Sequence, residues 1–118
     1  MEPGPWKRGA WIDFQDGDLI SHVVGSGQQK PNPQPSWRAY WEAHSNRQWP
    51  DTCRIYQCSN PPTLGAHIYL KEHGMQQNFI LPTCQSCNQD KRYFYGIGYC
   101  SPNVGSRAVW IDRHPNTL

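Results

Sequence analysis

Two pairs of cysteines constrain this chain more than any other feature. Cys53 and Cys58 are separated by four residues, and after a gap of 25 residues Cys84 and Cys87 are separated by two. Structural zinc sites need four tetrahedral ligands, and two closely spaced pairs of thiolates supply them. We therefore predict a Zn²⁺ ion bound by all four cysteines. Its role should be structural, because four thiolates leave no coordination position open.

The composition supports a metal rather than disulfides. The 118-residue chain is 36% hydrophobic, with 11 prolines and 10 glycines. This length fits one domain, residues 1–118, with a modest core, and a core poor in aliphatic residues needs a disulfide or metal to stabilise it. Five cysteines, an odd number without a secretion signal, argue against a disulfide framework. We expect Cys100, the fifth, to be a small packing residue or to replace a ligand of the first pair.

Charge and hydropathy restrict the partners only weakly. The formal charge is +2, and residues 37–118 carry eight Lys or Arg against five Asp or Glu. A mildly basic half permits a phosphate-bearing partner without requiring one. The sequence has no signal peptide and no apolar stretch able to span a bilayer, so we expect an intracellular protein, in cytoplasm or nucleus, without a membrane partner.

The pattern of residues predicts an α+β fold. Strand-like runs flank Asp16-Gly17 and favour a hairpin, Ser36 can cap a helix, and Pro50 can stop it. The expected order is an N-terminal β-hairpin (1–24), an exposed Pro/Gln-rich loop (25–36), an aromatic helix (37–49) and a zinc-braced core (50–118).

One face of the predicted helix is aromatic. Trp37, Tyr40, Trp41 and His44 follow the spacing i, i+3, i+4, i+7. Such a stripe can stack on bases or fill a partner's groove, but at this spacing we expect it to pack against the rest of the domain. His44 is expected to be a packed residue rather than a ligand.

The core region has its own order of elements. CRIYQC (53–58) suggests a strand leading to a turn, residues 65–83 a β-hairpin that turns near residues 72–74, residues 88–95 two helical turns, and residues 107–111 a last strand. A cysteine knuckle, a hairpin and a second cysteine pair that opens a helix together form a treble clef.

The motifs CRIYQC, GAHI and ILPTCQSCN resemble the HNH (ββα-metal) nuclease group, in the version braced by a four-cysteine zinc, over roughly residues 50–100. The resemblance implies that His67 is the general base and that Asn88 orients the loop bearing it. It also implies a catalytic Mg²⁺ or similar ion. A structural alternative is that His67 is hydrogen-bonded across the hairpin to the loop at Asn88.

The expected ligands of that catalytic ion are missing. Ala66 stands where the group has Asp or His, and Gly96 and Ile97 stand at the distal ligand position. Neither can bind a hard cation. Asp90, at the start of the helical turns, is expected to cap them, and His73 and His114 are expected at the surface. We therefore interpret the chain as a degenerate HNH-like scaffold.

Three functions remain open. The first is a noncatalytic module that contacts nucleic acid, DNA or RNA, or a protein, through Lys71, Lys91, Arg92 and Tyr93, with Tyr69 and Tyr95 nearby. The second is an active metal-dependent endonuclease that uses His67 as general base. The third is that the zinc domain only confers stability while the N-terminal hairpin and aromatic helix bind a protein.

Overall fold

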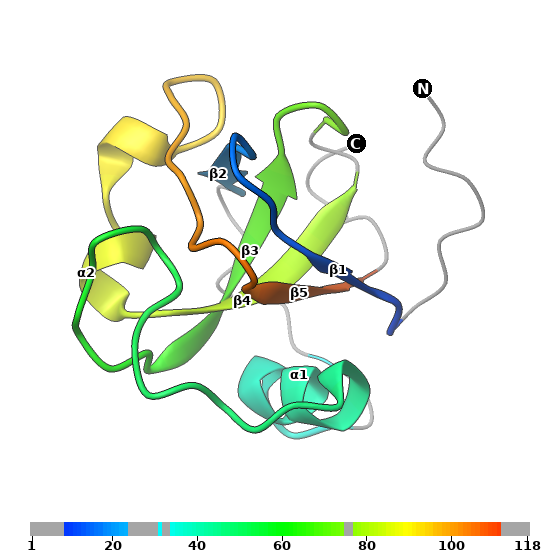
Figure 1. The fold of residues 1–118 in the computed structure, drawn as a ribbon. Helices are drawn as coiled ribbons and strands as arrows, with labels where there is room; N and C mark the ends of the chain where they lie inside the picture. The colour runs from blue at the N-terminus through cyan, green and yellow to red at the C-terminus, as the bar shows by residue number, and fades with distance from the viewer. Residues whose placement is uncertain (1–8, 24–30, 32–33, 75–76, 112–118) are drawn as a thin grey trace.

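The computed structural model describes residues 9–23, 31, 34–74 and 77–111, and these form an α+β fold, as predicted. Five antiparallel strands make one sheet in the order β1-β5-β4-β3-β2 (Figure 1). The elements are β1 (Trp11–Asp13), β2 (Ile20–His22), α1 (Trp37–Ser45), β3 (Leu64–Leu70), β4 (Asn78–Thr83), α2 (Gln85–Asn88), the 3₁₀ turn η1 (Lys91–Tyr93) and β5 (Arg107–Trp110). Most of the expected 25–36 loop lies outside the described residues.

The predicted N-terminal hairpin is wrong in its pairing. Both strands form, and the turn between them closes with a bond from Asp18 N–H to Gln15 O. However, β1 pairs with β5 and β2 pairs with β3, so the two strands lie at opposite edges of the sheet. Pairing two strands of three residues with each other would add little stability, whereas β5 and β3 are partners already anchored in the core. The turn therefore carries the chain from one edge of a curved sheet to the other.

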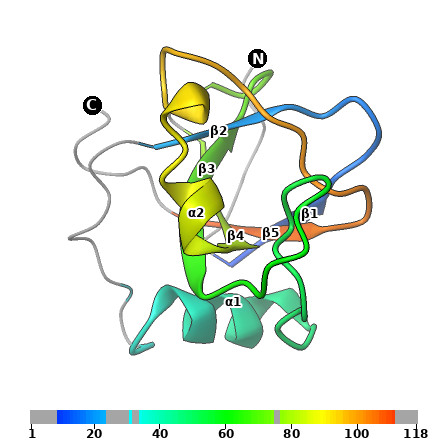
Figure 2. The ribbon, with the colours of Figure 1, turned by 90° about the vertical axis from the view of Figure 1, so that its left-hand side faces the viewer.

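The hairpin of β3 and β4 forms as predicted and divides the molecule into two faces. On one face, Ala66, Ile68 and Leu70 join the larger apolar cluster that also contains the buried cysteines. On the other face, His67 lies directly opposite Ile80, and Ile80 packs under α1. Figure 2 shows α1 running along one side of the sheet.

Helix α1 begins where the sequence predicts, because the Ser36 hydroxyl accepts the Ala39 N–H at 3.1 Å. It ends at Ser45, earlier than the predicted residue 49, because Asn46 adopts the left-handed conformation (φ 60°) that terminates helices. Pro50, which was expected to stop the helix, therefore lies beyond its end. With nine residues, α1 is the longest described helix, and no helix among the described residues has the length and apolar content to cross a bilayer.

The aromatic stripe packs inward, as expected. Tyr40 and Trp41 are buried against Ile80 and Val109. The Tyr40 hydroxyl donates to Trp110 O at 2.7 Å, so its polar end is satisfied within the core. His44 packs on Tyr40, with 4.5 Å between ring centroids.

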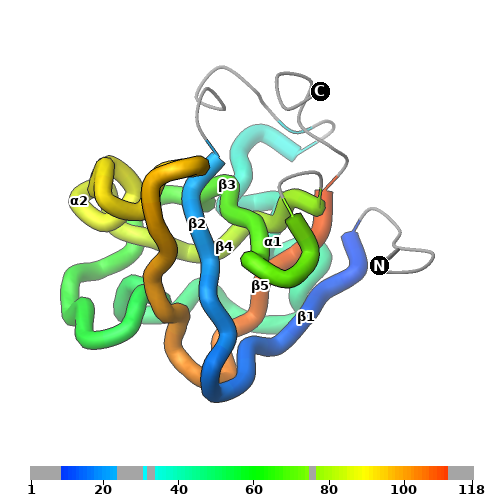
Figure 3. Tube along the Cα trace, turned by 90° about the horizontal axis from the view of Figure 1, so that it is seen from above, coloured from blue at the N-terminus to red at the C-terminus, as the bar shows by residue number. Residues whose placement is uncertain are grey.

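Two irregular segments, residues 53–58 and residues 94–100, lie beside the sheet. Residues 53–58 form no strand, only a single bridge between Ile55 and Pro102. Residues 94–100 run along the outer edge of β2, where Ile20 and Cys100 exchange backbone hydrogen bonds of 2.9 and 2.8 Å. Figure 3 shows this segment beside β2.

Replacing Tyr40 with Phe tests the packing of α1. We expect the free energy of unfolding to fall by about 0.5–1.5 kcal/mol, because the hydrogen bond from the Tyr40 hydroxyl is lost while the Trp110 carbonyl keeps its bond from the Gly9 N–H. Urea unfolding followed by circular dichroism measures the change. Tyr95→Phe, an exposed position, is the matched control and should change little. An unchanged stability of Tyr40→Phe would contradict this view of the helix–sheet contact.

Candidate metal centre

The four predicted cysteine ligands come together in the fold. The Sγ atoms of Cys53, Cys58, Cys84 and Cys87 all lie within 4.8 Å of one another. The sulfurs of Cys58 and Cys84 are 3.7 Å apart. A tetrahedron with bonds of about 2.3 Å from zinc to sulfur has edges of about 3.8 Å. The cluster therefore has dimensions that suit a bound metal ion.

The first pair sits in a tight knuckle. Cys53 N–H donates to Asn60 O at 2.7 Å, and Cys58 N–H donates to Ile55 O at 3.1 Å. Gln57, just before Cys58, has φ 68°. A residue other than Gly is strained in this left-handed conformation. Such strain is common where surrounding contacts hold a functional loop in place.

The second pair is positioned by the start of α2. Cys84 caps this helix, and its Sγ accepts the Cys87 N–H at 3.4 Å. The Cys84 N–H in turn donates to Cys53 Sγ at 3.2 Å. The Asn60 amide reaches Cys84 Sγ at 3.8 Å. These donors favour negative charge on the sulfurs, as metal binding requires.

The thiols affect one another's protonation. Burial raises the pKa of Cys53 to about 11, against hydrogen bonds from the Cys84 and Ile55 backbone. Burial and the neighbouring thiols also raise the pKa of Cys87. Burial would raise the pKa of Cys84 too, but hydrogen bonds, foremost from Cys87, lower it to about 7. Crowded thiols therefore resist ionising together unless a cation joins them, which is the property of a metal site.

Donor chemistry narrows the choice of metal. Four thiolates in a tetrahedral arrangement suit Zn²⁺ or iron–sulfur chemistry and not Mg²⁺ or Ca²⁺. A zinc ion held this way would supply structure and no reaction, since all its positions would be filled. Cys100 is outside the cluster, buried among the apolar core residues as expected, and burial raises its pKa to about 12.

His67 and Asn88 lie on different sides of the sheet. The His67 side chain is 5% exposed and meets the Trp37 ring edge-on, with 4.8 Å between centroids. Asn88 ends α2, on the side of the cysteines. Ala66, beside His67, faces the cysteine-bearing core. The fold thus places the candidate base under α1 rather than on an open surface.

The predicted contact residues form two groups. Lys91, Arg92 and Tyr93 make up η1, while the Lys71 ammonium lies 5.4 Å from the centre of the Tyr99 ring. Arg92 is bound to Asp90 by bonds of 2.7 and 3.0 Å. Asp90 also caps η1 by accepting the Arg92 N–H, so its predicted capping role is confirmed.

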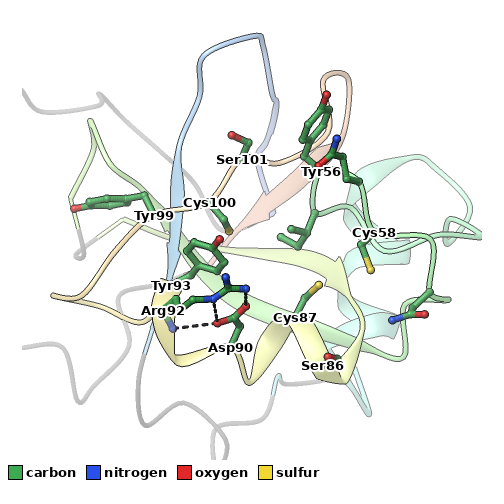
Figure 4. Close-up of a pocket in the computed structure, with 13 residues that line it drawn as sticks. Tyr56, Cys58, Ser86, Cys87, Asp90, Arg92, Tyr93, Tyr99, Cys100 and Ser101 are labelled. Carbon is green, nitrogen blue, oxygen red and sulfur yellow. Dashed lines mark hydrogen bonds and ion pairs between the residues drawn. The ribbon is translucent and has the colours of Figure 1, made fainter.

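A cavity of about 580 Å³ adjoins the cysteines. Figure 4 shows Cys58 and Cys87 beside it, with Tyr93 and the Asp90–Arg92 pair along its wall and Tyr56 at its rim. Tyr99 also lines it. The cavity therefore joins the metal centre to η1.

His22 is a buried histidine that the sequence analysis did not single out. Its ring meets the Phe94 ring edge-on, with 6.2 Å between centroids, and neither ring nitrogen makes a hydrogen bond of good geometry to a described residue. Burial lowers the pKa of His22, opposed by the Cys87 backbone and by Asp90. The alternation of Ile20 with His22 puts both on the core face, which was the available signal.

Comparison with known proteins finds no relative: no protein-family model, no curated protein and no solved structure matches the chain. The resemblance to the HNH group thus rests on the motif residues alone. What the fold establishes is a four-cysteine cluster with the geometry to hold a metal ion.

We predict that Cys53→Ser loses the metal and that a chelator unfolds the wild-type protein, because the binding free energy of such a site is largely folding free energy. Metal content by mass spectrometry and near-ultraviolet circular dichroism measure the two effects. Cys100→Ala is the control, since it removes a core thiol outside the cluster and should retain the metal. Full metal content in Cys53→Ser, or a fully folded metal-free protein, would contradict the assignment.

Proposed function

We propose that this chain is a zinc-stabilised, HNH-like binding module without catalytic activity, and that it contacts single-stranded nucleic acid. One observation carries the proposal: the exposed tyrosines gather around the metal centre and the edge of β2. Of the six exposed large apolar residues among those described, Tyr56, Tyr95, Ile97 and Tyr99 lie in the two loops at residues 53–60 and 94–101.

The tyrosines form a connected surface. Tyr95 and Tyr99 both contact the buried ring of Tyr69, at centroid distances of 6.0 and 6.1 Å. Tyr69 thus anchors two exposed rings without being exposed itself. Rings held this way lose little entropy when unpaired bases stack on them, and each base–aromatic stack contributes about 1–3 kcal/mol.

Cationic side chains border this surface. Neither Lys71 nor Lys91 forms an ion pair with a described residue, whereas the charge of Arg92 is offset by Asp90. The Arg92 side chain is 76% exposed and lies over the Tyr93 ring at 5.1 Å. Two unpaired cations favour phosphate contacts of modest strength, which suits a mildly basic module.

The same geometry supports a noncatalytic module over a nuclease. A general base must come within hydrogen-bond reach of its water, but His67 lies beneath Trp37. Among the described residues, the four cysteines are the one group of His, Cys, Asp or Glu that could hold an ion. No second cluster for Mg²⁺ exists within that part of the chain.

Binding can be measured by fluorescence anisotropy with labelled oligo(U) and oligo(dT). We expect Tyr95→Ala/Tyr99→Ala to weaken binding tenfold or more, because two stacking rings are lost. The slope of log K against log salt should be roughly −1 to −2, as expected for two phosphate contacts on a single strand. Val104→Ala, an exposed apolar residue outside the tyrosine surface, is the control. Absence of binding even at low salt would reject nucleic acid and favour a protein partner.

Cleavage is a separate question. We expect the zinc-loaded protein to leave supercoiled plasmid and single-stranded RNA intact in Mg²⁺ or Mn²⁺, with His67→Ala behaving identically. Gel electrophoresis after prolonged incubation gives the readout. Cleavage by the wild type that disappears in His67→Ala would overturn the noncatalytic assignment and establish the nuclease alternative.

A further inference from the structure

A second cavity, of about 220 Å³, lies between the end of α1 and the turn before β5. Three arginines, Arg47, Arg54 and Arg107, line it together with Trp41 and Gly105–Ser106. They are separated in the sequence, so no sequence motif predicts the site. None of them belongs to the tyrosine surface or the cysteine cluster.

The guanidinium groups are held in place by the fold. Arg47 Nη1 donates to Gly105 O at 2.8 Å, and Arg107 Nη1 donates to Ser45 O at 2.7 Å. Arg54 donates through Nε to Ser106 Oγ at 2.9 Å and through Nη1 to Thr52 Oγ1 at 3.3 Å. The Nη2 of Arg54 makes no hydrogen bond within the described part of the chain. Fixed groups with unused donors are prepared to bind an anion without further ordering.

Positive charge at this cavity exceeds the negative charge that balances it. Asp13 accepts bonds of 2.7 and 2.9 Å from Arg107 and lies 3.8 Å from Arg47. Arg54 has no carboxylate within ion-pair distance among the described residues. Three guanidinium groups thus face one carboxylate, and arginine cannot relieve the excess by losing a proton.

The geometry points to a phosphate group as the ligand. We propose that the cavity lined by Arg47, Arg54 and Arg107 binds one phosphate group, either free inorganic phosphate or the terminal phosphate of a nucleic acid. The planar guanidinium matches two phosphate oxygens at once. The cavity is smaller than the roughly 300 Å³ at which pockets for larger ligands begin, so it has room for one such group. This site would exist whether or not the tyrosine surface binds nucleic acid.

The first test uses inorganic phosphate as the probe, on the metal-loaded protein at constant ionic strength set with chloride. Binding is followed by amide and arginine Nε shifts in nuclear magnetic resonance spectra. We expect saturable shifts at residues 47, 54 and 105–107, and affinity about tenfold lower in Arg54→Gln and in Arg47→Gln. Arg38→Gln, a surface arginine on α1 paired with Glu42, should match the wild type.

The outcomes separate clearly. The proposal would be overturned if the wild type does not saturate with phosphate, or if Arg54→Gln and Arg47→Gln bind phosphate as tightly as the wild type. Arg47 is 42% exposed, so Arg47→Gln keeps the test valid if Arg54→Gln does not fold. Phosphate should also raise the melting temperature of the wild type more than that of Arg47→Gln.

A second arm identifies the source of the phosphate. Oligonucleotides of one sequence with a 5′-phosphate or a 5′-hydroxyl are compared on the wild type and on Arg47→Gln. Tighter binding of the phosphorylated form that is lost in Arg47→Gln assigns the site to a nucleic-acid end. Equal binding of both forms, with inorganic phosphate still saturating the site, assigns it to the free anion.

Discussion

The cluster of four sulfurs brings residues 53–60 to the end of the central strand β4. Residues 53–60 have a single β-bridge to the rest of the chain, at Ile55, and β4 ends just before Cys84. A metal ion bound by the four thiolates would add a cross-link between this loop and β4, beside the bond from Arg54 N–H to Pro82 O at 3.1 Å. The larger cavity is lined by this loop, and Arg54 carries the loop's contribution to the smaller one. Both cavities are therefore lined by residues of the loop that such a metal ion would hold.

The sheet separates two tasks. Beneath α1, aromatic side chains and Ile80 form a closed contact in which Trp37 covers His67. On the opposite face the core carries the cysteines, and around the edge of β2 the tyrosines remain exposed. Closing one face supplies stability that a chain poor in aliphatic residues needs, and it leaves exposed the loops around the cysteine cluster, as the proposed binding function requires.

Local patterns in the sequence predicted what depends on local chemistry. The cysteine spacing predicted the cluster, Ser36 predicted the start of α1, and the two strand-like runs within residues 65–83 predicted the hairpin of β3 and β4. Pairing across the chain was not predictable, because a three-residue strand such as β1 carries too little pattern to specify β5 as its partner. The cavity lined by the three arginines could not be predicted from the sequence either. Its members are separated in sequence, and only the turn before β5 brings Arg107 to Arg47 and Arg54.

The segment along β2 has a consequence for self-association. Backbone groups of an outer strand normally offer a template to which another chain can add a strand. Here Ile20 and His22 already bond to residues 94–100, so that edge is occupied. At the other edge β1 has only three residues, and the Arg107 guanidinium covers the Trp11 ring at 4.4 Å. One edge occupied by the chain itself and the other only three residues long leave little backbone to which another chain could add a strand.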